Sequence, residues 1–464
     1  MQGTTTRRVF FAGAASAVSA LRVWGANDRI RVAIVGLGGR GSNHLSVYSK
    51  LSGAQVAGLC DVNQAARERS QAFLTKAGAE KAKEFEDMRE AFADPNIDAV
   101  SIATPNHWHA LASIWAMKAG KDVYCEKPAC YNIHEGLRMV EVQRETKKML
   151  QIGSQHRSNP FKIKAMEAMH GGLIGKIYSA KGLCYKRRVS IGRKPDLDQP
   201  PAGLNWELFL GPAPLRKFNE LRFRYNWHWF WDTGNGDIGN QGVHEMGVAR
   251  WAMGDPEWPL TAFAHGGKFA YDDDQETPNT LTANFDYGGR ELRFEVRGLL
   301  TGGEGVAPTP RRRGGAAGGN AAAPPAGNPE GATAPVGGRP INVMVGDMFH
   351  GSEGWAVMSD EGFQAFKGES NEIAMELRPE RGPGGGDTTS PHMQNFLDGV
   401  RSRRQSDLHD GIQIAHFSAG LCHLANISYR VGRKLTLKAG PSFVNDPEAV
   451  KMLTRPAYRK PYVV

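Results

Sequence analysis

The sequence predicts an α/β protein with a doubly wound parallel sheet in its N-terminal part and a second domain with its own sheet. Three observations support this. Short apolar runs alternate with helix-forming stretches between residues 30 and 153, and a glycine-rich turn follows the first run. Further strand-like segments then occur at 281–299 and 341–366. Strands that alternate with helices are typical of parallel sheets that bind ligands at the carboxyl ends of their strands.

The composition places the chain among globular proteins of two domains. It has 464 residues, of which 41% are hydrophobic and 23% charged, with a net charge of +9. No block of Lys and Arg is interleaved with aromatic residues, which argues against nucleic-acid binding. No apolar run is long enough to predict a transmembrane span. The cysteines are few and odd in number, which predicts core thiols and no disulfide framework: Cys60, Cys125, Cys130, Cys184 and Cys422.

Residues 1–26 have the layout of an export signal. Arg7 and Arg8 precede two phenylalanines and an Ala-rich apolar run at 12–21. The arginine pair resembles a twin-arginine signal, and the alternative is a disordered basic leader. Because the twin-arginine route exports folded proteins, we expect a periplasmic or otherwise exported protein whose thiols stay reduced.

The first structural unit is a strand, a glycine-rich turn and a helix. The apolar run 31–35 leads into Gly36, Gly38 and Gly41, spaced G-x-G-x-x-G. Gly36 permits the tight turn, Gly38 lets the backbone approach a pyrophosphate, and Gly41 lets the helix pack close to the strand. The helix N-terminus then favours the negative charge of the phosphates.

Other residues of this unit complete a predicted dinucleotide site. Gly39 and Arg40 belong to the turn itself, and Asp61 ends the next apolar run. A carboxylate at that place bonds the hydroxyls of an adenosine ribose and favours NAD over NADP. Arg67 follows closely, and because an arginine can bind the 2′-phosphate of NADP, NADP remains an alternative cofactor.

The strand at 99–103 is followed by a second predicted part of the site. Thr104 is expected to cap the next helix, with Pro105 in its first turn. Ligands bind beyond the carboxyl ends of parallel strands, so this loop should lie beside the glycine turn. Asn106 and His109 are therefore predicted to face the nicotinamide or its ribose.

Glu126, Lys127 and Pro128 directly follow the strand at 122–125. A lysine there points into the crevice beside the cofactor. It either orients a substrate hydroxyl or acts as the base, if burial lowers its pKa. Glu126 is predicted to contribute to cofactor binding.

Four features together resemble the Gfo/Idh/MocA family, which includes glucose–fructose oxidoreductase and inositol dehydrogenase: residues 33–41, Asp61, residues 103–107 and residues 126–128. The resemblance runs from about residue 30 to about residue 437. It implies a Rossmann NAD(P)-binding domain at 27–153 and a substrate-binding domain at 154–440 with a large open, mostly antiparallel sheet. It also implies that Lys127 is catalytic and that the Lys127–Pro128 bond is cis.

The second domain contributes further candidates. Residues 155–158 leave the last strand of the first domain and should line the cleft, where Arg157 is a candidate to bind a substrate hydroxyl or carboxylate, or the Glu126 region. The stretch 225–251 begins with crowded aromatic residues, among them His228 and Trp231. Aromatic faces suit sugar rings, although a Trp-rich core explains the same pattern.

Asn240 and His244 span one helical turn, so their side chains are expected to face the same point. The stretch resembles the family's D-x-G-x-H, in which an Asp and a His hold substrate hydroxyls and assist proton transfer. Here Asn240 replaces the Asp, and an amide holds a hydroxyl but accepts no proton. General-base work then falls on His244 or Lys127, with Asp237 a weaker substitute.

The remaining segments predict little chemistry. His228, Asp237, His244 and Glu245 match no closed Zn²⁺ set, and hydride transfer needs no metal, so none is expected. Residues 302–340, dominated by Gly, Ala and Pro, predict a disordered surface insert within a hairpin connection. Residues 441–464 are expected to form a tail that wraps over the surface or meets another subunit of a homo-oligomer, a dimer or tetramer.

These features predict NAD(P)-dependent oxidation of a secondary alcohol of a sugar, polyol or glycoside. Lys127 and His244 are placed at the reacting hydroxyl, with Asn240, Arg157 and Asn106 as positioning residues. Because no free NAD(H) pool is expected outside the cytoplasm, export predicts a tightly retained cofactor. Two alternatives stay open. One is a redox-neutral glycoside hydrolase or lyase that uses bound NAD for transient C3 oxidation and elimination. The other is a non-enzymatic sugar-binding protein, against which the intact glycines argue.

Overall fold

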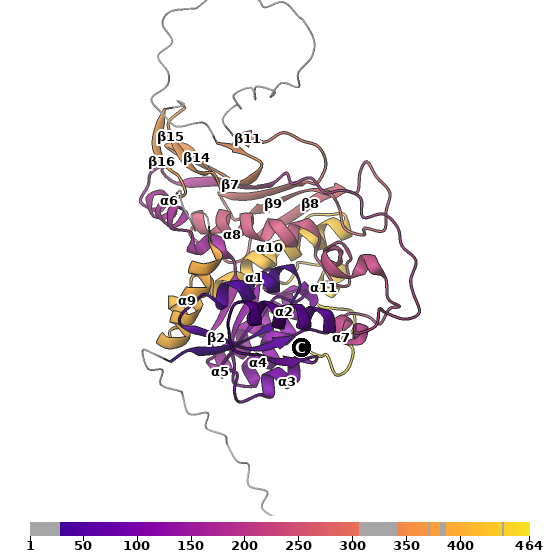
Figure 1. Ribbon diagram of the computed structural model, residues 1–464. Helices are drawn as coiled ribbons and strands as arrows, with labels where there is room; N and C mark the ends of the chain where they lie inside the picture. Colours follow the sequence, from indigo (N-terminus) through magenta and orange to yellow (C-terminus); the bar gives the residue numbers. More distant parts are fainter. Residues whose placement is uncertain (1–27, 306–340, 370–371, 381–386, 439) are drawn as a thin grey trace, which may run out of the picture.

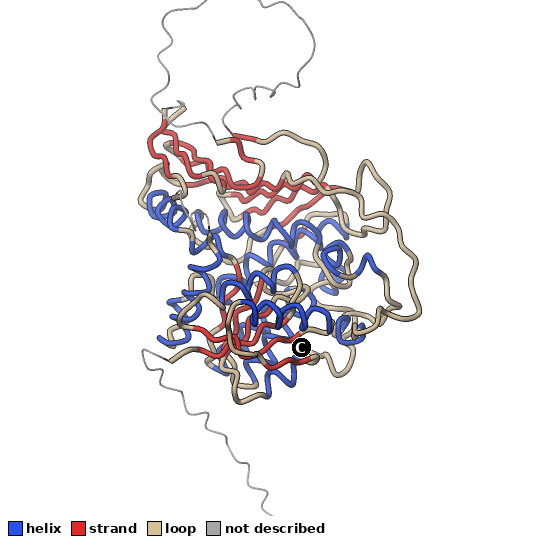
Figure 2. The backbone as a smooth tube through the Cα atoms, viewed as in Figure 1, coloured by secondary structure: helices blue, strands red, loops and turns tan. Residues whose placement is uncertain are grey.

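A computed structural model describes residues 28–305, 341–369, 372–380, 387–438 and 440–464. The predicted leader at 1–26 and most of the predicted insert lie outside the described residues. Figure 1 shows two layers of strands, one low in the view and one at the top, with helices between them. Figure 2 shows the same arrangement by secondary structure, with the upper strands in one continuous red layer.

The N-terminal domain is built on a parallel sheet of six strands in the order β3-β2-β1-β4-β5-β6. The strands are β1 (Ile30–Val35), β2 (Ala54–Cys60), β3 (Lys83–Phe85), β4 (Ala99–Ile102), β5 (Asp122–Glu126) and β6 (Leu150–Gly153). The helices are α1 (Gly39–Tyr48), α2 (Gln64–Lys76), α3 (Met88–Ala93), α4 (Asn106–Lys118) and α5 (Ile133–Thr146). Residues of β1, β4 and β5 are buried on both faces, as continuous apolar strands of a parallel sheet are. The order reverses between β1 and β4, which is where such sheets bind ligands.

The C-terminal domain contains a nine-stranded sheet in the order β16-β15-β14-β13-β7-β10-β9-β8-β17. Its strands are β7 (Ile177–Cys184), β8 (Thr261–Gly267), β9 (Thr280–Asp286), β10 (Glu291–Arg297), β13 (Val345–Gly351), β14 (Gly354–Ser359), β15 (Gly362–Lys367), β16 (Ile373–Leu377) and β17 (Leu435–Thr436). The pair β7–β10 is parallel, and the other pairs are antiparallel. The predicted fold class, with a mostly antiparallel second sheet, is therefore confirmed.

One face of this sheet is covered by helices that separate it from the N-terminal domain. These are α6 (Pro160–His170), α8 (Val243–Ala252) and α10 (Ile412–Val431). Burial alternates along β9 and β10, so every second side chain enters the shared core. Helix α9 (Thr389–Ser402) instead packs against the N-terminal domain, because its apolar face joins the core around β1 and α1.

Short elements complete the chain: α7 (Trp206–Leu210), α11 (Pro447–Lys451), the 3₁₀ turns η1 (Gln155–Ser158), η2 (Glu220–Arg222), η3 (Arg224–Trp229) and η5 (Gln405–Asp407), and the π-helical turn η4 (Ile238–Gly242). The two-residue strands β11 (Glu304–Gly305) and β12 (Asn342–Val343) pair antiparallel, so the described ends of the predicted insert lie side by side. Residues 304–305 are thus strand, although the insert was predicted to begin at 302.

The C-terminal tail folds back over the N-terminal domain. The Tyr462 ring meets the Trp108 ring of α4 edge-on, with centroids 5.5 Å apart. The Arg455 guanidinium and the Tyr458 hydroxyl both donate to the buried carboxylate of Glu135. All five cysteines are buried and free, as predicted. Within the described ranges, no helix has both the length and the apolar character needed to span a membrane.

Candidate functional site

The glycine turn lies between β1 and α1, and two of its glycines are required by packing. Gly36 has a φ of +85°, and a Cβ there would lie 2.8 Å from the carbonyl oxygen of Ala103. A Cβ on Gly41 would overlap the carbonyl oxygen of Gly36. The turn and the loop after β4 therefore touch through their backbones, which only glycine allows.

The other two glycines border open space. A Cβ on Gly38 or Gly39 would meet no described atom within 4 Å, and α1 begins at Gly39 with no side-chain cap. Nearby, Nη2 of Arg40 and Oγ1 of Thr104 are buried and have no partner among the described residues. Open space at a helix N-terminus, with unpartnered donors beside it, fits the pyrophosphate of a dinucleotide.

Asp61 is fixed at the end of β2 by backbone donors. Its Oδ2 accepts from the N–H of Leu37 at 2.6 Å, and its Oδ1 accepts from the N–H of Asn63 at 2.8 Å. Burial raises the pKa of Asp61, and these two hydrogen bonds oppose the rise. Arg67, the residue that left NADP possible, donates to the Asp61 carbonyl oxygen and lies 3.9 Å from Glu84.

Glu126 is a buried anchor beneath the turn, which differs from its predicted role in binding cofactor. Its Oε1 accepts from Nε of Arg40 at 2.8 Å and from Nε2 of Gln155 at 3.0 Å, and lies 2.9 Å from Nε2 of His44. Burial alone would raise the pKa of Glu126, but Arg40 and His44 hold it well below its usual value. The glycine turn, β5 and the start of the second domain are tied together at this carboxylate. His44 was not predicted from the sequence, because there it looks like an ordinary polar residue of a helix.

The loop after β4 also departs from prediction in detail. Pro105 is the N-cap residue of α4, which begins at Asn106, and no side chain caps it. His109 places Nδ1 2.7 Å from the carbonyl oxygen of Pro128 and Nε2 2.8 Å from that of Thr104. Its ring nitrogens are thus engaged by the backbone, and His109 joins two loops of the site. The Asn106 amide donates to Oδ1 of Asn235 at 2.9 Å.

Lys127 directly follows β5 at the junction of the two domains, and the Lys127–Pro128 bond is cis. Its Nζ lies 2.5 Å from the backbone carbonyl oxygen of Asn240 and 3.2 Å from Oδ1 of the same residue. Burial lowers the pKa of Lys127, while Glu126 opposes the change. The sequence predicted both residues, and the structure brings them together.

Asn240 holds this position because its amide has partners on both sides. Its Nδ2 donates to the Tyr225 hydroxyl at 3.0 Å and to Oδ1 of Asp237 at 3.2 Å. Asp237 is itself held by Arg188, whose Nε and Nη2 donate to its two oxygens at 2.9 and 2.6 Å. The amide nitrogen therefore faces acceptors, and the amide oxygen faces Lys127. Tyr225, half exposed at the edge of this group, was not predicted as a site residue, although it opens the aromatic stretch.

His244 follows in the first turn of α8, after the π-helical turn that carries Asn240. Its ring lies beside that of His156, with centroids 5.1 Å apart and planes at 34°. Burial lowers the pKa of His244 well below its usual value, and Lys127 and His156 lower it further. His244 is thus a neutral imidazole within electrostatic range of Lys127.

Three other predicted substrate residues have protein partners. The nitrogens of Arg157 contact Asp255 at 2.6 and 2.9 Å, the Gly247 carbonyl oxygen at 3.3 Å and Asp410 at 3.4 Å. This buried network holds α8 to the domain junction, and these contacts do not support the prediction that Arg157 binds substrate or lies at Glu126.

His228 and Trp231 are also engaged by neighbours. Nδ1 of His228 lies 2.6 Å from the Tyr225 carbonyl oxygen, and burial lowers the pKa of the ring to about 3. Trp231 donates its backbone N–H to Glu276 at 2.7 Å, and Arg430 lies over its indole at 5.2 Å. The charge of Lys127 contributes to the low pKa of His228, whereas among the described residues no hydrogen bond or ring contact joins Trp231 to Lys127 or Asn240.

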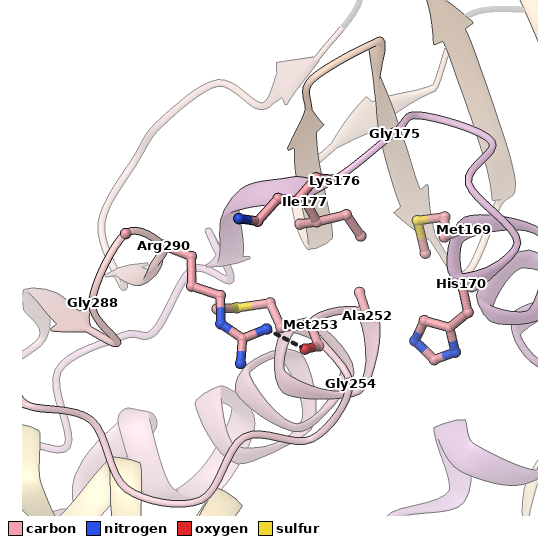
Figure 3. Close-up of a pocket in the computed structure, with 11 residues that line it drawn as sticks. Met169, His170, Gly175, Lys176, Ile177, Ala252, Met253, Gly254, Gly288 and Arg290 are labelled. Atoms are coloured by element: carbon pink, nitrogen blue, oxygen red, sulfur yellow. Dashed lines mark hydrogen bonds between the residues drawn. The ribbon is translucent and has the colours of Figure 1, made fainter.

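A pocket of about 450 Å³ lies elsewhere, at the C-terminal end of α8 (Figure 3). Arg290 borders it and donates to the carbonyl oxygen of Met253 at 2.7 Å, and His170 has its Nε2 2.8 Å from the Trp251 carbonyl oxygen. None of the predicted site residues lines it. No group of three or more His, Cys, Asp or Glu suited to a metal ion occurs in the described part of the chain.

Two sequence models of the Gfo/Idh/MocA oxidoreductases match the chain. The model described as an oxidoreductase family with an NAD-binding Rossmann fold matches residues 30–154. The model of that family's C-terminal alpha/beta domain matches residues 162–268. Together they span half of the 464 residues, and they confirm the predicted NAD-binding Rossmann domain.

Curated relatives match about a third of the chain. An inositol 2-dehydrogenase from Salmonella paratyphi B is 32% identical over 175 residues, which are 37% of this chain and 50% of the relative. A glycosyl hydrolase family 109 protein from Shewanella pealeana is 27% identical over 154 residues, which are 32% of this chain and 34% of the relative. The chain thus spans about a third to a half of the length of these relatives.

A solved structure extends the likeness to both domains. Levoglucosan dehydrogenase in complex with NADH and levoglucosan superimposes with a TM-score of 0.63 over 88% of this chain and 99% of that one. Sequence identity is 16%, so this likeness concerns the fold.

Proposed function

Because the chain belongs to the Gfo/Idh/MocA oxidoreductase family, we propose that it oxidises a secondary alcohol of a sugar, polyol or glycoside with NAD. When bound, NAD accepts a hydride from the carbinol carbon. The residues that would hold it are the glycines of the β1–α1 turn and Asp61, with Arg40 and Thr104 beside the pyrophosphate. The observation that carries the proposal is Lys127, held beside Asn240 at the carboxyl end of β5.

In this proposal Lys127 is the base. A neutral amine has two N–H donors and one lone pair, and Asn240 offers two oxygens within 2.5 and 3.2 Å of Nζ. Donation to both leaves the lone pair for the hydroxyl proton of the substrate. Burial supports this assignment because it lowers the pKa of Lys127 and thereby favours the neutral amine.

Asn240 contributes by being neutral. A carboxylate at this position would attract a proton to Lys127 and keep it an ammonium, whereas an amide holds the same geometry without charge. The replacement of the family's Asp therefore moves the general-base role to Lys127. His244, a neutral imidazole nearby, hydrogen-bonds the same hydroxyl or a neighbouring one, and the exposed face of Tyr225 stacks on the sugar ring.

A direct experiment tests the reaction class. The full chain is purified from the compartment in which it accumulates, and the bound nicotinamide is identified by mass spectrometry after denaturation. The holoprotein is then mixed with myo-inositol, levoglucosan and glucose separately, and the absorbance of reduced nicotinamide is followed. We expect at least one of these three compounds to reduce the bound nicotinamide of the wild type, and none to reduce it in a Lys127→Ala variant. This result would also oppose a non-enzymatic sugar-binding role. Equal reduction by that variant would refute the assignment of Lys127.

We further propose that the protein is exported through its Arg7–Arg8 leader, that its cofactor is tightly retained, and that it forms a homo-oligomer. Nicotinamide that survives extensive dialysis would support retention, and its complete loss would refute it. Light scattering tests the oligomer.

A second candidate function is redox-neutral glycoside cleavage. The similarity to a family 109 glycosyl hydrolase favours it, at 27% identity over 154 residues. In that reaction, oxidation at C3 makes the C2 proton acidic, and elimination at C1 is followed by hydration and reduction. Incubation of a C2-deuterated glycoside in H₂O separates the two functions, because only elimination washes out the label.

A further inference from the structure

His244 and His156 form a pair of imidazoles from distant parts of the chain. His244 lies in α8, and His156 lies in η1, which leaves the last strand of the N-terminal domain. Their ring centroids are 5.1 Å apart. In each ring Nδ1 is buried and has no hydrogen-bond partner among the described residues. Two adjacent buried ring nitrogens without partners are unusual, because buried polar atoms are nearly always paired.

His156 leads from this pair to the surface. Its Nε2 lies 3.7 Å from Oδ1 of Asp360, whose side chain is 80% exposed. Nζ of the buried Lys162 donates to the same oxygen at 3.0 Å and so fixes the carboxylate. Nε2 is thus the ring nitrogen of His156 that faces the carboxylate, and a ring proton on Nε2 would leave the lone pair on the buried Nδ1.

We propose that His244, His156 and Asp360 form a proton relay between the reacting hydroxyl and solvent. Lys127 takes the hydroxyl proton, His244 receives it from Lys127, and His156 passes it to Asp360, which releases it to water. Rotation of one ring, or one water molecule between the rings, completes the path from His244 to His156. At every step one N–H or O–H bond forms as another breaks, so the relay carries one proton and no electrons.

The charges around the pair suit this role. Burial, together with the charges of Lys162 and Lys127, lowers the pKa of His156 to about 3, while Asp360 opposes the change. For His244, Lys127 and Arg40 lower the pKa and Glu126 raises it. Both rings are therefore neutral between turnovers, and a neutral imidazole accepts a proton on one nitrogen as it releases one from the other.

The relay gives the proton a defined path out of the site when substrate and cofactor are bound. Lys127 is partly buried beside Asn240, and substrate and cofactor in the cleft would exclude water from it. The inference rests on the proposed function, since the proton it carries is the one that alcohol oxidation releases.

The kinetic test compares two neighbouring exposed acids. Asp360→Asn removes the last member of the relay, and Glu361→Gln makes the same charge change one residue away. In weak buffer, reduction of the bound nicotinamide and proton release to a pH indicator are followed in a single half-reaction. We expect Asp360→Asn to slow both by about tenfold or more, since a positioned proton carrier contributes about 10²–10⁴-fold. Added imidazole restores the rate, and Glu361→Gln behaves as wild type.

The outcomes separate the relay from the proposed function. The relay is overturned, and the proposed function stands, if the nicotinamide of the wild type is reduced and that of Asp360→Asn is reduced equally fast. The same holds if Asp360→Asn is slower but imidazole does not restore its rate. If no polyol reduces the wild type, both fail together. A substrate-free measurement is ¹⁵N NMR of histidine-labelled protein, in which His156→Gln identifies the His156 signals. The relay requires the Nε2–H tautomer of His156, and an Nδ1–H tautomer would overturn it.

Discussion

Replacing Asn240 by Asp should restore the family's acid and raise the pKa of Lys127. The new carboxylate would lie about where Oδ1 now lies, 3.2 Å from Nζ. At an effective dielectric constant of about 20, a unit charge at that distance attracts the ammonium by about 5 kcal/mol, or about four pKa units. Asp237, 3.2 Å from the amide nitrogen, repels the new charge and reduces its effect. We therefore expect a rise of about one to three units, the range of measured close pairs.

The pKa of Lys127 can be followed without substrate. Competitive acylation across a pH series, read by mass spectrometry of the Lys127 peptide, gives the protonation of its amine. With a reducing polyol in hand, the rate of nicotinamide reduction at neutral pH should fall about tenfold for each unit of rise and recover at alkaline pH. The control is Asn240→Ser, which removes Oδ1 without adding charge and should produce no alkaline shift. An Asp variant with an unchanged or lower pKa of Lys127 would refute the assignment of this lysine as the base.

Three further predictions concern Lys127, the glycine turn and Arg157. Lys127→Ala should slow nicotinamide reduction by about 10²–10⁴-fold without loss of bound nicotinamide, which mass spectrometry checks. Gly39→Ala should leave the unfolding temperature unchanged but abolish cofactor retention, because its Cβ would meet no atom of the described residues and would enter the space proposed for the pyrophosphate. Gly41→Ala should lower the unfolding temperature, because its Cβ would overlap the carbonyl oxygen of Gly36. Arg157→Ala should destabilise the fold by about 3–5 kcal/mol in denaturant titrations, because it leaves buried acids unpaired. In the wild type Arg157 lowers the pKa of Asp255 against the effect of burial, so this pair stabilises above the unfolded-state pKa of Asp255, and the contribution is lost as pH falls through the folded-state pKa. A stability difference between wild type and Arg157→Ala that does not shrink in acid would contradict this.

The fold of the N-terminal domain could be predicted from local sequence. Gly36 and Gly41 are set by contacts within a few residues or across adjacent strands, and the alternation of apolar runs with helices fixes a parallel sheet. Lys127 was found for the same reason, since the residue after a parallel strand must lie at the ligand-binding edge. The sequence also identified Asn240 as the departure from the family's pattern.

Only the tertiary structure decided which of these polar groups are free to meet a substrate. Arg157 reads as available in the sequence, but the fold brings Asp255, 98 residues away, into a bidentate pair with it. Glu126 and His109 are engaged in the same way by partners from other elements. Conversely, His156 and His244 meet only when η1 and α8 pack, and sequence gives no sign of that. The conformational preferences of the backbone are local, whereas the pairing of buried charges depends on which distant segments the core brings together. The sequence alone therefore predicts which residues have the right chemistry, but it does not predict which side chains they pair with.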